Sequence, residues 1–227
     1  MRWTSITVRV LGLLIAAGGF LGRAVWPTCC AFCGAKQHNR PVCDACSADL
    51  PRIAGNCLYD QAPFVVVVVP FDYAFPVDAA IKAFKFHRKL FYAPAFAYLL
   101  GPALAALPDD VDAVLPVPLH WRRHALRGFN QAAEIARPIR VATGLPLVRN
   151  VFRRRATPYQ SMLAAAHRRR NLRAAFRVRG KLACKHLLIV DDVITTGETC
   201  RQLAHAVLQA GVEKVSVLAI ARAIAPD

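Results

Sequence analysis

The clearest pattern of apolar and polar positions in this 227-residue chain begins with four consecutive apolar residues, 187–190. A short, wholly apolar run is typical of a strand that is buried on both faces within a parallel sheet. Two acids and a hydroxyl-rich turn follow, and apolar residues then recur at helical spacing at Leu203, Val207 and Leu208, before Gly211. Because glycine often ends a helix, the pattern predicts a strand, a turn and an amphipathic helix.

The pattern elsewhere predicts elements of the same architecture. Five valines, 65–69, stand between prolines and indicate a strand, and residues 112–118 indicate a second, short strand broken by prolines. An amphipathic helical region is expected from Ile81 to Leu107, and Asn130 is a suitable N-cap for a helix that runs past Ile135. We therefore expect an α/β fold, with an open, mainly parallel sheet and flanking helices, in a domain that spans residues 61–227.

The turn after the apolar strand has the composition of a phosphate site. Ligands bind at the carboxyl ends of the strands in an open α/β sheet, where the next helix offers unpaired N–H groups. Gly197 lets the backbone approach an anion, and the neighbouring threonines add donors. Asp191 and Asp192 can accept hydrogen bonds from hydroxyl groups or face a hydrated Mg²⁺. A phosphorylated sugar fits this combination, and the alternative is an ordinary capped helix start.

Charge is distributed very unevenly along the chain. The sequence carries 30 Lys and Arg residues against 14 acids, a net charge of +16. Residues 113–190 contain 17 of the basic residues and one acid, Glu134, so this central segment alone accounts for the excess. Such a field favours anionic ligands, either phosphorylated small molecules or nucleic acid.

The first 26 residues are predicted to form an apolar N-terminal helix. Arg2 and Arg9 precede an apolar stretch, 10–21, which resembles a signal peptide. The stretch is too short to span a bilayer, and Arg23 and Trp26 crowd the position of a cleavage site. We expect a helix that packs on the protein or against a partner, no transmembrane segment, and a cytoplasmic protein.

Cysteines predict a metal-binding module in residues 27–60. Cys30 and Cys33 form one C-x-x-C pair, and Cys43 and Cys46 form another. Two such pairs present four thiolates to a tetrahedral Zn²⁺, which would be structural because no coordination position stays open. Two disulfides in a secreted domain are the alternative, and Cys29 could replace Cys30 as a ligand.

The run from Val190 to Thr199 resembles the fingerprint with which type I phosphoribosyltransferases bind phosphoribosyl pyrophosphate (PRPP). The resemblance implies that Asp191 and Asp192, the candidate catalytic residues, hold the ribose 2′- and 3′-hydroxyls. It also implies that the following turn holds the 5-phosphate. The candidate PRPP-binding residues of this turn are Val193, Ile194, Thr195, Thr196, Gly197, Glu198 and Thr199.

Taken together, motifs along nearly the whole chain resemble the ComF (competence protein F/GntX) family. They are the two cysteine pairs, Lys85-Phe86, residues 116–120, residues 127–131, Gln160, Arg168-x-x-Asn171 and residues 191–199. The run Arg127-Gly128-Phe129-Asn130-Gln131 is the most specific of these. Family members often carry further cysteine pairs, whereas here only Cys57 follows the first two. We therefore expect one zinc ion and not two.

The resemblance also implies a pyrophosphate side and a loop that closes over it. Its candidate residues are Pro116, Val117, Pro118, Arg127, Asn130, Gln131, Lys85, Gln160, Arg168 and Asn171. On the sequence alone, Lys85 fits a solvated helix face better, and residues 127–131 would fit a capped helix preceded by a basic loop. The basic segment 149–179 occupies the place of the closing loop, although its arginines suit a nucleic-acid backbone equally well.

Three functions are consistent with these residues. The first is phosphoribosyl transfer from PRPP with Mg²⁺, in nucleotide-related metabolism or in DNA uptake during natural transformation. The second is a non-catalytic competence component that binds single-stranded DNA and keeps a regulatory or vestigial PRPP site. The third is a zinc-containing adaptor for a DNA-uptake helicase. No residue identifies the base that would accept the phosphoribosyl group.

Overall fold

The computed structural model describes residues 29–53, 62–154 and 175–223. The predicted helix over residues 1–26 lies outside these ranges, as do Cys57 and three candidate loop residues, Gln160, Arg168 and Asn171. Within the described ranges, no helix is long and apolar enough to cross a membrane.

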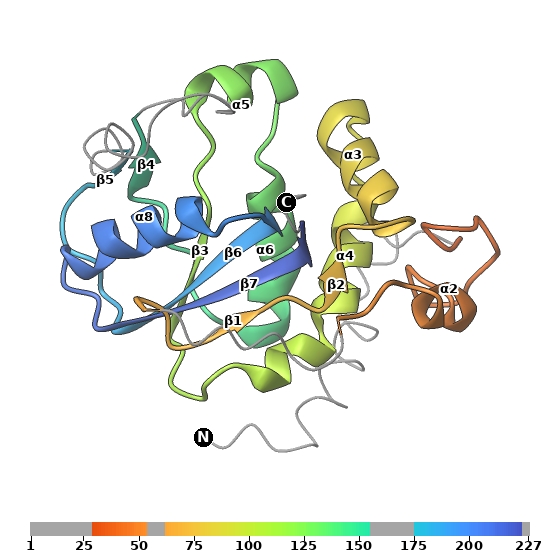
Figure 1. Ribbon diagram of the computed structural model, residues 1–227, viewed down its shortest axis with the longest axis horizontal. Helices are drawn as coiled ribbons and strands as arrows, with labels where there is room; N and C mark the ends of the chain where they lie inside the picture. The colour runs from red at the N-terminus through yellow and green to blue at the C-terminus, as the bar shows by residue number, and fades with distance from the viewer. Residues whose placement is uncertain (1–28, 54–61, 155–174, 224–227) are drawn as a thin grey trace.

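A parallel sheet forms the centre of the molecule (Figure 1). Its strands run in the order β1-β7-β6-β3, and β2 continues along β7 beyond the end of β1. Pairing of β6 with β7 begins at His186 opposite Lys214 and ends at Ile194 opposite Arg222. The strands are β1 (Val67–Val68), β2 (Phe71–Asp72), β3 (Ala113–Pro116), β6 (His186–Ile194) and β7 (Lys214–Arg222).

Helices cover both faces of this sheet, because its central strands are apolar on both sides. Along β6, Leu188 and Val190 pack into one core with α3, α4 and α6, whereas Leu187 and Ile189 pack into a second core with α8. The helices are α3 (Val77–His87), α4 (Tyr92–Leu100), the 3-10 helix η2 (Pro102–Ala106), α5 (Trp121–Arg127), α6 (Gln131–Thr143) and α8 (Glu198–Leu208). The expected α/β fold is therefore confirmed.

Several predicted boundaries were wrong. The helical region expected over residues 81–107 begins at Val77 and breaks after His87, where Arg88 has a φ of 53°. The valine run 65–69 contains only the two-residue strand β1. The segment before Arg127, a basic loop in the alternative interpretation of the sequence, is the helix α5, whose N-cap His120 accepts a hydrogen bond from the backbone of Arg122. Asn130 does cap α6, as predicted, by accepting from the N–H of Ala132.

The strand before the phosphate turn is also longer than predicted. It continues through Asp191 and Asp192 to Ile194, since its pairing with β7 continues there. Its other neighbour, β3, ends at Pro116 opposite Val190. The acids therefore lie on a strand that projects beyond β3.

A separate antiparallel pair borders the undescribed part of the basic segment. It consists of β4 (Val151–Arg153) and β5 (Phe176–Val178), with Phe152 opposite Arg177. The two ends of the predicted closing segment are thus held together as a hairpin base next to α8.

The cysteine-containing segment packs on the outer side of α4. It includes the short helix α2 (Asp44–Ala48), and its residues Cys30, Val42 and Leu50 are buried in the same core as α3 and α4. Figure 1 shows α3 and α4 between α2 and the sheet.

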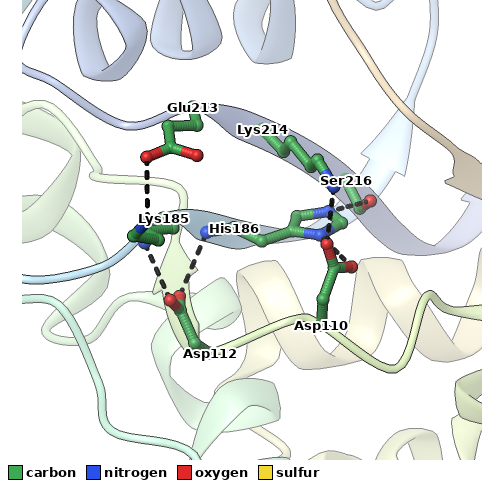
Figure 2. A network of polar contacts seen from close by, with 7 residues as sticks. All are labelled: Asp110, Asp112, Lys185, His186, Glu213, Lys214 and Ser216. Carbon is green, nitrogen blue, oxygen red and sulfur yellow. Dashed lines mark hydrogen bonds and ion pairs between the residues drawn. The ribbon is translucent and has the colours of Figure 1, made fainter.

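The amino-terminal ends of β6 and β7 are joined by a polar network (Figure 2). Asp112 accepts hydrogen bonds from the backbone N–H groups of Lys185 and His186, at 2.8 and 3.2 Å. The buried His186 ring lies between Asp110, 2.6 Å from its Nδ1, and Ser216, 2.8 Å from its Nε2. Ion pairs of Lys214 with Asp110 and of Lys185 with Glu213 complete the network.

Candidate ligand cleft and metal centre

A cleft of about 280 Å³ opens at the carboxyl end of the sheet. Its floor is the projecting end of β6, and its walls come from α3, the α5–α6 turn, the residues after β3, and β4. Figure 1 shows α5 and α3 rising on this side of the sheet. The predicted residues that line the cleft are Lys85, Val117, Pro118, Arg127, Asn130, Gln131, Asp191, Asp192, Val193, Thr195 and Thr199.

Asp192 is a buried carboxylate with one cationic partner from α3. It is 7% exposed, and its Oδ1 lies 2.9 Å from Nζ of Lys85. The Lys85 side chain is itself largely buried, so the pair is only weakly screened by water. Lys85 therefore belongs to the cleft and not to a solvated helix face, the interpretation that the sequence alone favoured.

Asp191 is less well neutralised. Burial raises the pKa of its carboxyl to about 7, and repulsion by Asp192 adds to the shift. The N–H of Asp192, at 2.9 Å from Oδ1, and the charges of Lys85 and Arg153 oppose the shift. Two adjacent acids share limited positive charge, so hydroxyl donors or a cation from a ligand would stabilise the ionised pair.

The turn after β6 is built as a helix start with an open backbone. Gly197 is the N-cap of α8 and has a φ of 73°, a conformation that glycine adopts without strain. The hydroxyl of Thr196 accepts a hydrogen bond from the N–H of Glu198 at 3.4 Å. Thr195 and Thr199 face the cleft, while Ile194, Thr196 and Gly197 line a neighbouring cavity of about 180 Å³ that also includes Thr195.

The opposite wall begins with the capped start of α6. The side chain of Asn130 donates to the carbonyl of Val117 at 3.0 Å, which fixes the α6 start to the segment after β3. Gln131, 2% exposed, accepts from Arg127 through Oε1, at 3.2 Å. Its Nε2 is buried without a hydrogen-bond partner among the described residues, next to the cleft that Gln131 lines.

Six lining residues outside the predicted set, among them Ala132, complete the walls. Tyr73, Phe86 and Leu119 add apolar surface, and Arg123 and Arg153 add charge. Burial lowers the pKa of Arg153, as does repulsion by Arg123, while Asp191 opposes that shift. The high density of arginines in residues 149–179 pointed to this segment, but nothing in the sequence singled out Arg153 itself.

Four cysteines meet in the N-terminal segment. The Sγ atoms of Cys30, Cys33, Cys43 and Cys46 all lie within 4.8 Å of one another, and the cluster does not include Cys29. The Sγ atoms of Cys33 and Cys43 are 3.8 Å apart. Two thiolates each about 2.3 Å from one tetrahedral zinc ion would be about 3.8 Å apart, so the cluster fits this metal.

The ionisation of the cluster also fits a bound cation. Burial alone would raise the pKa of Cys30, but backbone N–H groups, including that of Cys43 at 3.4 Å, lower it to about 6. Burial and hydrogen bonds shared with neighbouring thiols raise the pKa of Cys46. Four thiolates in one place need a positive charge to neutralise them, and a divalent metal supplies it.

Comparisons with known proteins identify relatives over almost the entire chain. DNA utilization protein YhgH of Escherichia coli O157:H7 is 34% identical over 210 residues, which cover 88% of this chain and 92% of the relative. Competence protein F of Haemophilus influenzae is 31% identical, with 86% and 90% covered, and competence protein ComFC of Bacillus subtilis is 25% identical, with 80% and 72% covered.

The chain belongs to the ComF family.

Within this ComF family member, residues 125–226 match the model of the phosphoribosyl transferase domain. The match includes α6, the Asp191-Asp192 pair and the turn into α8, so the predicted fold and family are both confirmed. It begins after Lys85 and the cysteine cluster. Lys85 therefore joins the cleft through the fold, and both features lie in segments outside the matched domain.

Other predicted site residues do not line the cleft in this family member. Pro116 is the last residue of β3 and pairs with Val190. Glu198 accepts from Arg201 at 2.9 Å and from Gln202 at 3.0 Å on α8, so it contributes to the first turn of that helix. Gln160, Arg168 and Asn171 lie outside the described residues, and their assignment stays a prediction.

Proposed function

We propose that this ComF family member binds PRPP with Mg²⁺ in the cleft at the carboxyl end of the sheet. The observation that carries the proposal is a single cleft shared by two acids, by Thr195 and Thr199 of the turn into α8, and by a basic wall. The acids suit vicinal hydroxyls, the turn suits a terminal phosphate, and the wall suits a pyrophosphate. A simple phosphate ligand would not require the acids.

In this assignment Asp191 and Asp192 accept hydrogen bonds from the ribose hydroxyls. The turn from Val193 to Thr199 surrounds the 5-phosphate, with N–H groups at the start of α8 as donors. Arg127, Gln131 and the segment after β3 face the pyrophosphate, together with the loop residues Gln160, Arg168 and Asn171. Lys85 holds the Asp192 carboxylate in place, because their ion pair is short and shielded from water.

The chemistry supported by this site is transfer of the phosphoribosyl group to a nitrogen nucleophile. The bond between the anomeric carbon and the pyrophosphate oxygen breaks, a carbon–nitrogen bond forms, and the nucleophile loses a proton. Mg²⁺ near the two acids would neutralise part of the pyrophosphate charge. The chain's own groups orient the sugar through the acids and stabilise the departing anion through the basic wall. No covalent protein intermediate is needed.

Titration calorimetry tests binding first. The protein should bind PRPP with Mg²⁺. When ribose 5-phosphate replaces PRPP, the affinity should be weaker and less heat should be released. A screen of nitrogenous bases for pyrophosphate release then separates an enzyme from a binding protein. Absence of PRPP binding by folded protein would overturn the proposal.

Binding of single-stranded DNA is the second candidate, favoured by the surface beside the cleft. The helix α5 has no buried residue, and it exposes Trp121 with the Arg122 guanidinium 5.3 Å from the ring centre. Arginines and an exposed ring can contact the phosphates and a base of a single strand. The names of the relatives, which refer to DNA utilization and competence, support this candidate.

Salt dependence tests the DNA candidate. Affinity for an unstructured oligonucleotide should fall steeply between low and physiological salt, and Arg122→Ser together with Arg123→Ser should reduce that slope by about 2. Affinity that does not change with salt would exclude a binding mode based on these arginines.

A further inference from the structure

A continuous series of aromatic side chains leads from the cysteine cluster to the ligand cleft. It begins in the cysteine segment, crosses α4 and α3, and ends in the turn before α6. Successive ring centroids are 5.9, 5.7, 5.8 and 5.4 Å apart along the series Phe32, Tyr92, Phe96, Phe84 and Phe129. Each of these spacings lies within the range of favourable aromatic pairs.

Both ends of this aromatic series are next to residues with proposed roles. Phe32 lies between the cluster residues Cys30 and Cys33 in the sequence, and its ring meets Tyr92 edge-on at 69°. At the other end, Phe84 immediately precedes Lys85 on α3, and Phe129 immediately precedes the cap residue Asn130. The series therefore connects the metal cluster to two separate walls of the cleft.

The middle of the series is rigid because it is buried. Phe84 and Phe96 are fully buried and belong to the core that also contains Cys30 and Val42. Close-packed interiors transmit displacements, since a ring cannot shift without moving its neighbours. Tyr92, at the boundary between the cysteine segment and α4, is partly buried and packs against the same core.

We propose that the metal-bound cysteine segment positions the Lys85 and Asn130 walls through this aromatic series, so that metal binding and PRPP binding strengthen each other. The inference rests on the proposed PRPP site. With zinc bound, Phe32 holds Tyr92 and α4 in place, and α3 presents Lys85 to Asp192. Without zinc, the anchored end of the series is released and the ion pair at the cleft loosens. Coupling between two sites is reciprocal, so PRPP must also raise the affinity for zinc.

The reciprocal effect gives a direct measurement on the full chain. Zinc transfer from the protein to a colorimetric chelator is followed with Mg²⁺ alone and with Mg²⁺ plus saturating PRPP. We expect PRPP to raise zinc affinity by about fivefold or more, a typical magnitude for coupled sites. PRPP affinity of zinc-depleted protein that stays folded by circular dichroism should fall by the same factor.

Variants of the series test whether the coupling uses it. Phe84→Leu should bring the coupling factor close to 1 while zinc and PRPP each still bind, and Phe32→Leu, at the partly exposed end, should do the same with less risk to folding. Phe71→Leu is the matched control, because Phe71 is a fully buried ring of the same core outside the series. It should lower stability comparably and leave the coupling factor unchanged.

The outcomes separate this inference from the proposed function. PRPP binding that is the same with and without zinc overturns the coupling and leaves the function intact. Coupling that persists at full strength in both Phe32→Leu and Phe84→Leu overturns the role of the aromatic series. Absence of PRPP binding by zinc-loaded protein overturns the proposed function and this inference together.

Discussion

The two ends of β6 carry similar polar residues. Those at the amino-terminal end find their hydrogen-bond and ion-pair partners within the protein, whereas those at the carboxyl end have fewer such partners among the described residues. At the amino-terminal end, both ring nitrogens of His186 have partners, and Asp110 is paired with Lys214 as well as with the ring. Asp112 completes this end by accepting two backbone N–H groups. Each principal charge there is matched within the protein.

At the carboxyl end, the polar groups exceed their partners. Asp191 and Asp192 are adjacent, and Lys85 forms its short ion pair with Asp192, while Oδ1 of Asp191 accepts the backbone N–H of Asp192. The buried Nε2 of Gln131 has no partner in that part of the chain. Two adjacent acids that line a 280 Å³ cleft are groups to which a ligand would supply further partners.

The comparison shows why a familiar constellation is not enough to define a site. Ser216, His186 and Asp110 are linked as a hydroxyl, an imidazole and a carboxylate, which is the arrangement of a hydrolytic triad (Figure 2). Ser216, however, is fully buried within β7, so no substrate can reach its hydroxyl. The triad joins strand ends, while the less complete set around Asp191 is open to a ligand.

The largest effect should follow a change in the phosphate turn. Gly197→Val places a branched side chain at a φ of 73° where the anion must approach, and should weaken binding of PRPP and of inorganic phosphate by more than about 100-fold. Gly180→Val is the control. Gly180 precedes the amino-terminal end of β6, has a φ of 71°, and has open space where a Cβ would be added. This variant should lose similar stability but bind both ligands normally, and titration with folding checked by circular dichroism measures this. If both variants bind PRPP and inorganic phosphate equally well, the turn is only the start of a helix and does not bind phosphate.

The acids should separate sugar recognition from phosphate recognition. Asp191→Asn keeps the shape and removes a charge-assisted acceptor, so PRPP affinity should fall by about 1.5–3 kcal/mol, one to two decades, with inorganic phosphate bound nearly as before. Asp110→Asn, at the other end of β6, should leave PRPP affinity unchanged and lower the free energy of unfolding. Calorimetric titrations of both ligands and denaturant unfolding of both variants provide the comparison. A PRPP affinity that drops equally in the two variants would contradict the division between the ends.

The same two carboxyls should give stability opposite dependences on pH. Because burial and Asp192 raise the pKa of Asp191 to about 7, its native form holds a proton that the unfolded chain has lost, and stability falls as pH rises from 3.8 to about 7. Lys214 and His186 lower the pKa of Asp110 to about 2, so its contribution is lost as pH falls from 3.8 to about 2. The Asp191 effect should amount to about 1–2 kcal/mol, given its coupling to Asp192.

Both pH dependences are tested by measuring the free energy of unfolding across this pH range and comparing each variant with the parent protein. Asp191→Asn should remove the decline between 3.8 and about 7, and Asp110→Asn should remove part of the decline below 3.8. The prediction is contradicted if the stability of the parent protein rises through the upper range and Asp191→Asn shows the same pH dependence. In that case nearby positive charges would fully compensate the ionised Asp191 carboxylate in the folded state.

Local signals in the sequence were sufficient for much of the carboxyl end. The apolar run 187–190, the acids and Gly197 are consecutive, and the cap at Asn130 needs only its own side chain and the next turn. By contrast, Tyr73 reaches the cleft from a segment whose local pattern carries no site signal, and Arg153 is not distinguished from the other arginines of its basic segment. Their roles depend on how β4 and the segment after β2 are placed by tertiary contacts.

Two local errors have physical reasons of the same kind. Acids are unusual within a buried strand, yet β6 continues through Asp191 and Asp192 because β7 pairs with it and β3 has ended. The helix α5 was not predicted, because it buries no residue and so its sequence lacks an apolar periodicity. Lys85 fits both a solvated face and an ion pair until its distant partner is known.

The smallest expected effect concerns the unmatched amide of Gln131. Gln131→Met keeps the length of the side chain, removes the Nε2 donor and also removes the Oε1 acceptor for Arg127. If Nε2 donates to a ligand oxygen, PRPP affinity should fall about three- to tenfold, near 1 kcal/mol. Stability without ligand should change by less than about 1 kcal/mol, since relief of an unsatisfied buried donor offsets the lost contact with Arg127. Gln202→Met on α8 is the control, because its Nε2 already donates to Glu198 at 3.0 Å, and PRPP affinity should not respond. Titration and denaturant unfolding of both variants decide the point. A Gln131→Met protein that is clearly more stable and binds PRPP like the parent would contradict this. The Nε2 group would then be an unsatisfied buried donor with no role in ligand binding.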